Sequence, residues 1–353
     1  MRRRIVSFLC LFTCLTFVAF ANDTNVVESE EDSAVQGKVS DTSNIETSNA
    51  NKPSWSFNLG TDFAYYPDSE YVTDSDTHFA PITGAYSGLE ARTTAHAVYT
   101  IPCAFSDNPF FSGNTLKIDS FLEATPVSVS PGAKVTFTPI AFLQLSAGAN
   151  VATAWDLIGI QGLAEYDETT DEYTVFDSFT AYYKVWAQGM FQFDLAALIP
   201  GDWTHIVTMD SYQVYYEDIT ADCNGAWKYQ GIGERFSVPA YYSSLVLGYQ
   251  MPAVPVLNTI AVQTELTGYF NTDSIDDYYD NWDPSFMKIS ISPLTILTLS
   301  EKDSLIVLFG FSSRRTFTTE QNDSDATDFT LTSSNGSREW YFNRIAISWS
   351  HSF

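Results

Sequence analysis

Long apolar runs are rare in this chain. Beyond residue 21 no stretch reaches the roughly 18 consecutive apolar residues expected of a membrane-spanning helix, and the mean hydropathy is −0.08. The sequence therefore excludes a protein that crosses a membrane with helices. It leaves a water-soluble β protein or a transmembrane β-barrel, whose strands turn half of their side chains away from lipid.

Basic residues are also scarce. The chain has 17 Lys and Arg against 43 Asp and Glu, which gives a formal charge of −26. A nucleic-acid-binding protein presents clustered basic residues to the phosphate backbone. No nucleic-acid partner is therefore expected.

Cysteines and cofactor motifs are few. Of the 4 cysteines, only Cys103 and Cys223 lie beyond residue 21, and the sequence leaves open whether they form a disulfide. The sequence contains neither a glycine-rich phosphate loop nor a Cys/His cluster with zinc spacing. We expect no cofactor and no metal site.

The first 21 residues have the pattern of an export signal. Three arginines at positions 2–4 precede an apolar run, residues 5–20, and residues 19–21 form a small-x-small cleavage site. The alternative, an uncleaved membrane anchor, needs about 20 apolar residues, more than this run provides. We expect cleavage near Ala21, which lowers the formal charge to about −29.

The rest of the chain divides by composition. Residues 22–54 are rich in acidic residues, Ser, Thr and Asn and have no aromatic residue, so they are expected to form a flexible acidic periplasmic tail. From residue 55 to residue 353, aromatic and β-branched residues dominate. We expect this second segment to be a transmembrane β-barrel.

Several stretches of residues 55–353 alternate with a period of two, which is typical of strands whose faces meet different surroundings. The clearest run, residues 179–195, places Phe179 and Tyr183 on one face and Lys184 and Asp194 on the other. A strand of about 17 residues is far longer than the usual 5 or 6 of a soluble sheet, and it is long enough to cross a bilayer. The same alternation recurs in residues 259–270, 304–317 and 345–353.

Long acidic connections alternate with short ones in the C-terminal half, as in outer-membrane barrels, which have short periplasmic turns and longer external loops. Counted back from a periplasmic C-terminus, this predicts a single antiparallel up-and-down barrel of about twelve strands, within a range of roughly ten to fourteen. The even number depends on dividing residues 134–164 into two strands. The expected strands are residues 55–66, 82–102, 114–129, 134–148, 151–164, 175–198, 203–217, 239–250, 259–270, 285–299, 304–318 and 337–353.

A soluble two-sheet sandwich would also alternate. Here, however, the apolar faces carry aromatic residues near their ends, such as Phe179, Phe191 and Trp349, where girdles lie at the two membrane interfaces. The chain has 26 Phe, 20 Tyr and 8 Trp, and this excess favours the membrane barrel. The expected fold class is all-β.

The last five residues, Trp349-Ser350-His351-Ser352-Phe353, resemble the terminal signature of bacterial outer-membrane β-barrels. The resemblance implies localisation in the outer membrane, contact with its lipid, and folding by the barrel-assembly machinery after escort by periplasmic chaperones. Residues 136–143 and 145–149 also resemble uncharacterised spirochaete (treponemal) outer-membrane barrels. The expected barrel-closing and assembly signal is Ile345, Ile347, Trp349, His351 and Phe353.

The polar faces of the strands suggest a function. Opposed charges across a lumen orient ions and polar solutes, so the sequence predicts a porin-like channel or small-solute transporter rather than an enzyme. The alternative is that these charges pair and fill a narrow barrel, since twelve strands lie between filled and open barrels. The candidate lumen-facing residues are Lys184, Asp194, Glu265, Lys288 and Arg314.

A second hypothesis is a surface-exposed adhesin or ligand-binding barrel that uses its long acidic loops. Residues 271–284 carry five Asp among aromatic residues. Their spacing does not match an EF-hand loop, so a solvated loop is favoured over a Ca²⁺ site, and the question stays open.

An outer-membrane hydrolase is the third hypothesis. The 4 histidines of the chain come without a G-x-S-x-G motif that would supply a nucleophile. We therefore do not favour a catalytic role for His78, His96, His205 or His351.

Overall fold

The computed structural model describes residues 52–69, 79–103, 114–157, 160–167, 172–176, 179–199, 201, 205–223, 225–230, 232–251, 254, 256–272, 275, 283, 285–321 and 329–353. Within these ranges, no helix has both the length and the apolar character needed to cross a membrane. The predicted signal peptide and nearly all of the predicted tail lie outside the described residues. The first strand begins at Ser54, at the predicted boundary of the tail.

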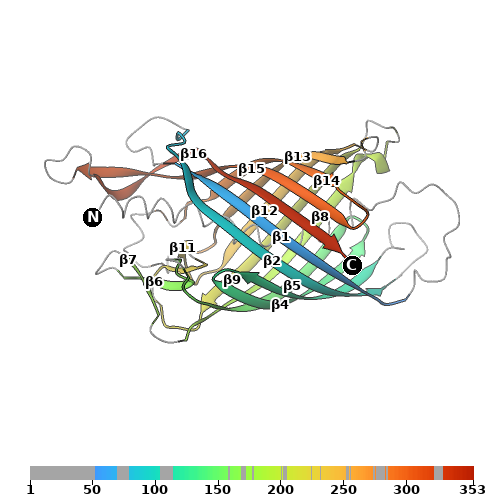
Figure 1. The fold of residues 1–353 in the computed structure, drawn as a ribbon, viewed down its shortest axis with the longest axis horizontal. Coiled ribbons are helices and arrows are strands. Elements are labelled where there is room, and N and C mark those ends of the chain that lie inside the picture. The colour runs from blue at the N-terminus through green and yellow to red at the C-terminus, as the bar shows by residue number, and fades with distance from the viewer. Residues whose placement is uncertain are drawn as a thin grey trace.

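Twelve strands of the described chain close into one antiparallel barrel, which confirms the predicted fold class and strand number (Figure 1). The order around the barrel is β1, β16, β15, β14, β13, β12, β9, β8, β5, β4, β3, β2. Their bounds are β1 Ser54–Asp68, β2 Gly84–Pro102, β3 Thr115–Thr125, β4 Ser128–Ile140, β5 Leu143–Ala154, β8 Ala181–Asp194, β9 Ile206–Ile219, β12 Ala240–Gln250, β13 Leu257–Tyr269, β14 Lys288–Thr298, β15 Asp303–Gln321 and β16 Phe329–Ser352.

The first and last strands close the barrel. Their antiparallel register runs from Asn58 opposite Ser352 to Tyr65 opposite Ile345, and the Phe353 amide donates a hydrogen bond to the Phe57 carbonyl at 3.0 Å. β1 therefore starts and β16 ends at the same end of the barrel, seen at the right of Figure 1. We call this the terminal end and the opposite one the cap end.

The outward face of the barrel is apolar and uncovered. Large aliphatic and aromatic side chains project from consecutive strands and stay about half exposed. A soluble protein rarely leaves so continuous an apolar surface open, whereas the hydrocarbon of a bilayer would cover it. Examples are Phe63 at 51%, Leu122 at 49%, Leu145 at 48%, Leu247 at 57%, Ile260 at 52% and Ile347 at 42% exposed.

Aromatic pairs stand at both edges of this apolar surface. Near the terminal end the Trp55 and Tyr99 rings lie 4.9 Å apart, and those of Phe142 and Phe191 lie 5.7 Å apart. Near the cap end the pairs are Tyr65 with Tyr86 at 6.3 Å and Tyr241 with Phe270 at 5.2 Å. Two aromatic girdles around an apolar band are the pattern of a transmembrane barrel.

The hairpins formed by β3, β4 and β5 correct the predicted strand boundaries. The turns fall at residues 126–127 and 141–142, so Pro131 and Gly132, which fall in the predicted break between the strands 114–129 and 134–148, lie inside β4. Pro131 is tolerated because the pairing of β4 with β5 passes over it. Gly132 is needed because a Cβ there would lie 2.2 Å from the Phe121 ring.

Two other predicted strands had wrong bounds. Residues 175–198 were expected as one strand, but β8 covers Ala181–Asp194 and a short 3-10 helix, η2 (Leu195–Ala197), follows it. The Asp194 side chain accepts a hydrogen bond from the Ala196 amide at 2.9 Å, and this cap ends the strand. The strand expected at residues 151–164 is displaced instead: β5 covers Leu143–Ala154, so the predicted break at residues 149–150 falls inside it.

A small separate sheet lies at the cap end of the barrel (Figure 1). Its strand order is β11, β10, β6, β7, with bounds β6 Leu163–Asp167, β7 Glu172–Val175, β10 Trp227–Tyr229 and β11 Ile232–Arg235. The strands come from the connections after β5 and after β9, so these two loops fold together. The cap sheet packs on the barrel mouth, where Tyr182 of β8 stacks on Tyr229 at 4.3 Å between ring centres.

The two cysteines beyond residue 21 are both free thiols. Cys103 follows the end of β2 at the terminal end, while Cys223 follows β9 at the cap end. A disulfide needs the two Cα atoms within about 7 Å, so a bridge between them is not compatible with this fold.

Candidate functional site

The interior of the barrel carries a belt of ionisable side chains in its cap-side half. We call these inward-facing residues the charged belt. Both signs are present, and every barrel strand except β4, β5 and β12 contributes at least one residue. The charged belt consists of Asp62, Glu90, Arg92, Glu123, Lys184, Glu217, Glu265, Lys288, Arg314, Glu339 and Arg344.

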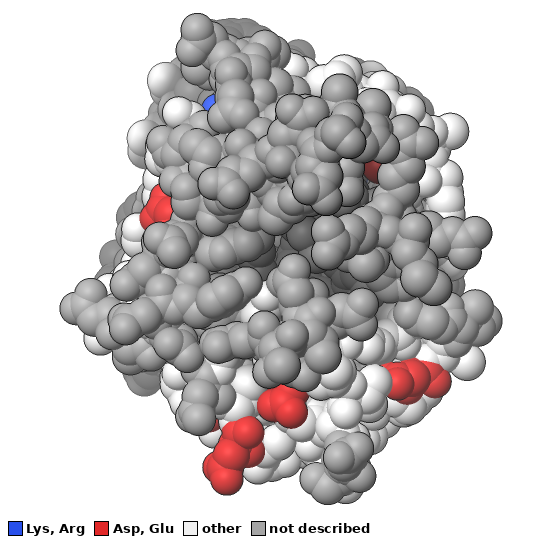
Figure 2. Space-filling model, turned by 90° about the vertical axis from the view of Figure 1, so that its left-hand side faces the viewer, with Lys and Arg blue, Asp and Glu red and all other residues white. Residues whose placement is uncertain are grey.

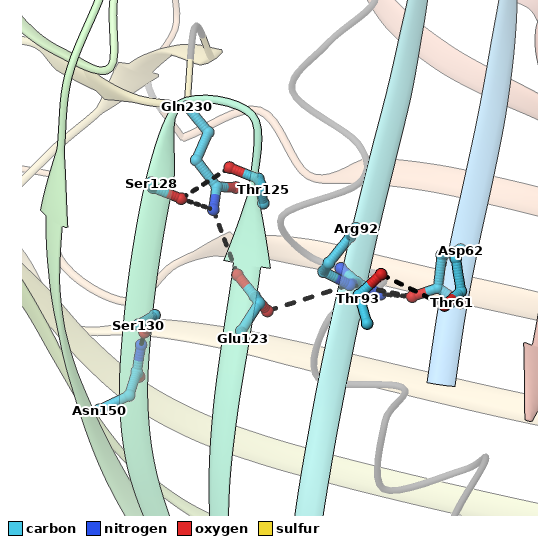
Figure 3. Close-up of polar contacts among 10 residues, drawn as sticks. All are labelled: Thr61, Asp62, Arg92, Thr93, Glu123, Thr125, Ser128, Ser130, Asn150 and Gln230. Atoms are coloured by element: carbon cyan, nitrogen blue, oxygen red, sulfur yellow. Dashed lines mark hydrogen bonds and ion pairs between the residues drawn. The ribbon is translucent and has the colours of Figure 1, made fainter. Parts of the chain in front are cut away.

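A polar ladder crosses the first three strands of this belt (Figure 3). The Arg92 guanidinium on β2 contacts Asp62 on β1, with Nε donating to Oδ2 at 2.9 Å, and lies 3.9 Å from the Glu123 carboxylate on β3. Gln230, just after β10, continues the ladder by donating to Glu123 at 3.2 Å and to Ser128 at 2.8 Å. The cap sheet is thereby tied to the barrel wall at β3 and β4.

The cap sheet is also anchored to the barrel wall at β8 and β9. Arg235 of β11 contacts Glu217 of β9 at 2.5 Å, and the Tyr182 hydroxyl donates to the same carboxylate at 2.9 Å. Trp227 and Tyr229 place their rings 5.8 Å from the Arg235 guanidinium. Arg235 is thus held by a buried ion pair and by aromatic faces.

On the remaining strands the charges also meet partners. Tyr242 of β12 donates to Glu265 of β13 at 2.7 Å. Arg314 of β15 contacts Glu339 of β16 and donates to the carbonyl of Ser69 at 3.1 Å. Ser69 directly follows β1, so Arg314 holds the start of the connection from β1 to β2 at the mouth of the barrel.

Neutral polar side chains form a layer below the charged belt, nearer the terminal end. Their hydrogen bonds link neighbouring strands. The pairs are Gln213 with Gln188 at 3.3 Å, Gln263 with Ser244 at 3.0 Å and Ser290 with Ser312 at 2.6 Å.

The five candidate residues from the sequence are not all in one place. Lys184, Glu265 and Arg314 are buried at 5%, 3% and 7% exposure within the charged belt, and Lys288 is half-buried at the start of β14. Asp194 instead lies at the terminal end, 3.5 Å from His205, where it caps η2.

Sequence reasoning missed most of the belt. Glu90 and Arg92 lie on β2, where the same period-two alternation places them with Thr94 and His96. That alternation was a usable signal. The pairing of Arg92 with Asp62 was not, because it depends on the register between β1 and β2.

The predicted assembly signal lies on the outward face of β16. The Trp349 and His351 rings stack at 6.0 Å, and the His351 and Phe353 rings meet edge to face at 4.7 Å. Asp303 of β15 accepts from Trp349 at 3.2 Å and lies 2.8 Å from His351. The row is ordered by these contacts, while its role in assembly stays a prediction, as does the treponemal resemblance.

The histidines and acidic residues are the chain's candidates for catalysis or metal binding. In that part of the chain no group of three or more His, Cys, Asp or Glu could hold a metal ion. His96 lies 3.0 Å from the Asp119 carboxylate and beside the Phe121 ring. Most of the acidic loop at residues 271–284 and His78 lie outside the described residues.

Comparisons with known proteins return barrels. No protein-family model and no curated protein matches the chain. Among solved structures, the beta domain of the Bordetella autotransporter BrkA is similar with a TM-score of 0.42 and 10% identity, covering 85% of this chain and 100% of that one. An outer membrane channel from Pseudomonas putida F1 has a TM-score of 0.41 and 9% identity, covering 88% and 100%.

The translocator domain of the autotransporter NalP from Neisseria meningitidis is a further likeness, at a TM-score of 0.35 and 6% identity, covering 95% of this chain and 98% of that one. All three TM-scores are below 0.5, so these similarities do not indicate a function. What this barrel can do follows from its own interior.

Proposed function

We propose that this barrel is a narrow, porin-like channel for small polar solutes, and that it resides in the outer membrane of a bacterium. The charged belt is the observation that supports the proposal most directly. Burying this many ionisable groups inside a membrane barrel is costly unless they face water or one another. Such groups in a membrane-spanning interior are typical of a solute path.

The arrangement of signs suggests how the belt acts. Basic and acidic groups adjoin around the wall, as in the ladder of Asp62, Arg92 and Glu123. Opposite charges across a lumen create a transverse field that orients dipolar solutes and ions as they pass. Small inward residues such as Ser290 and Ser312 lie next to the longer charged ones along the same strands.

The cap sheet narrows the entrance. Gln230 holds it on β3 and β4, and Arg235 holds it on β9, with β5 and β8 lying between these two attachments. A path restricted in this way favours small solutes over oligomers. We therefore place the solute class at small polar molecules and ions.

Planar-bilayer recordings of the refolded protein test the proposal. We expect stepwise unitary currents whose ion selectivity shifts toward cations in Lys184→Gln and toward anions in Glu265→Gln, because each change removes one sign from the belt. Lys302→Gln is the matched control, since Lys302 lies exposed in the turn before β15. A correctly folded barrel that carries no current would contradict the proposal.

Surface adhesion through the acidic loops is a second proposal. Figure 2 looks onto the cap end, where the described surface shows several acidic side chains and little basic charge. Deletion of residues 271–284 should then abolish ligand binding while the heat-modifiable mobility of the barrel on gels persists. Binding that survives the deletion would remove this loop from consideration.

A further inference from the structure

The cap sheet is joined to the barrel differently on its two sides. The chain enters the cap sheet from β5 and leaves it to β8, and it enters again from β9 and leaves to β12. These four strands are consecutive in the barrel order, so the chain itself holds the cap sheet on this side. On the other side, at β3 and β4, the attachment described above is made by the side chain of Gln230.

The packing on the two sides differs in the same way. On the chain-linked side a buried apolar cluster joins the cap sheet to the wall, and it resists separation because water would have to cover apolar surface. At β3 and β4 the contacts are hydrogen bonds, which water can replace at little net cost once the groups are wet. The apolar cluster consists of Ala152 of β5, Tyr182 of β8, Ile219 of β9, and Leu163, Trp227 and Tyr229 of the cap sheet.

The rim of the barrel is low where Gln230 reaches it. Every second connection between barrel strands lies at the cap end, and the one between β3 and β4 is a turn of two residues, 126–127. Its neighbours around the rim, from β1 to β2 and from β5 to β8, span residues 69–83 and 155–180. The hairpin of β3 and β4 therefore has no loop with which to cover its own part of the mouth, and the chain after β10 covers it instead.

Three side chains close this part of the mouth (Figure 3), and we call Gln230, Glu123 and Ser128 the latch. The Gln230 side-chain amide donates to the Glu123 carboxylate and to the Ser128 hydroxyl, and Thr125 meets Ser128 at 2.8 Å. Glu123 is 8% and Ser128 is 1% exposed. Residues beside a turn at the rim face water unless another element lies over them, so this burial reflects a seated cap sheet.

We propose that the cap sheet is a hinged lid, which stays packed on β5, β8 and β9 and lifts from β3 and β4 when the latch releases. The inference rests on the proposed channel function and supplies its entry step. With the lid closed, Arg92 and Lys184 of the charged belt are 4% and 5% exposed, so the mouth has to open before a solute reaches them. Lifting the lid exposes the polar ladder of Asp62, Arg92 and Glu123 to the cap end.

A reversible tether across the latch tests the lid. In a chain that carries Cys103→Ser and Cys223→Ser, the pair Ser128→Cys/Gln230→Cys is bridged with a short bifunctional methanethiosulfonate, since the two native side chains meet at 2.8 Å. In planar bilayers we expect bridging to lower the mean current and a reducing agent to restore it, because the bridge holds the lid closed.

The two single-cysteine chains, Ser128→Cys and Gln230→Cys, are the matched controls. The reagent attaches to either thiol but cannot join the cap sheet to the barrel. It should not lower the current of either chain, which separates tethering of the lid from a local effect of the attached group.

Thiol labelling reports the lid without any current. Ser130 is the next inward residue of β4 below Ser128, it is 1% exposed, and it contacts Asn150. In Ser130→Cys, a charged methanethiosulfonate should react about fivefold faster when Gln230→Ala is added, because the loss of about one net hydrogen bond shifts the ratio of open to closed lids by that factor. Lys302→Gln, in the exposed turn before β15, should leave the rate unchanged.

The outcomes separate the lid from the function on which it rests. A conducting protein whose current is the same before and after bridging would overturn the lid and leave the channel intact. Labelling of Ser130→Cys that Gln230→Ala does not accelerate would overturn the lid as well. A folded barrel without current, whose labelling still responds to Gln230→Ala, would overturn the channel function and retain a movable cap sheet.

Discussion

The ion pair between Arg92 and Asp62 allows a quantitative prediction. Arg92 is 4% exposed and contacts Asp62, with Glu123 3.9 Å from its Nε atom on the other side. Arg92→Gln removes the positive charge and leaves two carboxylates on neighbouring strands without it. Removal of one partner from a buried pair costs about 3–5 kcal/mol, and because the Asp62 side chain is 17% exposed we expect about 3 kcal/mol.

Equilibrium unfolding in urea, followed by tryptophan fluorescence in lipid vesicles, measures this loss. The double variant Asp62→Asn/Arg92→Gln should recover part of the stability, because one of the two uncompensated carboxylates is gone. Lys302→Gln in the exposed turn should change the free energy of unfolding by less than about 0.5 kcal/mol. The reasoning is wrong if Arg92→Gln behaves like Lys302→Gln, or if the double variant is less stable than the single one.

Two further changes probe the packing of the wall and the cap sheet. Gly148→Val should destabilise the barrel by about 1–3 kcal/mol through overpacking, because a Cβ at Gly148 would lie 2.3 Å from the Trp186 ring. Gly189→Ala should change the stability little, because a Cβ at Gly189 would meet only the Leu145 side chain, at 3.9 Å. Burial lowers the pKa of Lys228 in the cap sheet from 10.5 to about 7. Between these two pH values the unfolded cap sheet binds more protons than the folded one. The stability of the folded cap sheet should therefore rise with pH in this range. Resistance of the cap to proteolysis should accordingly increase from pH 7 to pH 9, and Lys228→Met should abolish that increase relative to the unmodified chain.

The sequence was sufficient for the fold because a membrane barrel imposes one simple pattern on every strand. Residues 179–195 and 259–270 alternate cleanly, and β8 and β13 lie within two residues of those runs. Lipid on one side of each strand and a polar interior on the other require apolar and polar side chains to alternate with a period of two. The prediction of twelve strands rested on this pattern and was confirmed.

Turns in the N-terminal half were harder to locate. Pro131-Gly132 has the composition of a turn, but the chain turns at Pro126-Val127 and keeps Pro131 in β4. Its missing amide is harmless only because the pairing with β5 skips that position. Local composition could not reveal this, because the register between two strands is a tertiary property.

The interior could be predicted only in part for the same reason. Alternation shows that Lys184 and Glu265 face away from lipid, but not which group each one meets. The contact between Asp62 and Arg92 joins residues thirty positions apart, and Gln230 reaches Glu123 across 107 positions. Such contacts depend on strand register and on how a loop folds over the mouth, and a single sequence specifies neither in any local pattern.

The position of each charge along the barrel axis carries more information than the formal charge of the chain. The chain is strongly acidic, at −26, yet much of its basic complement faces the barrel interior, including Arg92, Lys134, Lys184, Arg314 and Arg344. The acidic surplus must therefore lie mainly on the outer parts of the molecule. The interior is nearly balanced in charge, because basic groups there lie beside carboxylates, as Arg92 does beside Asp62 and Glu123.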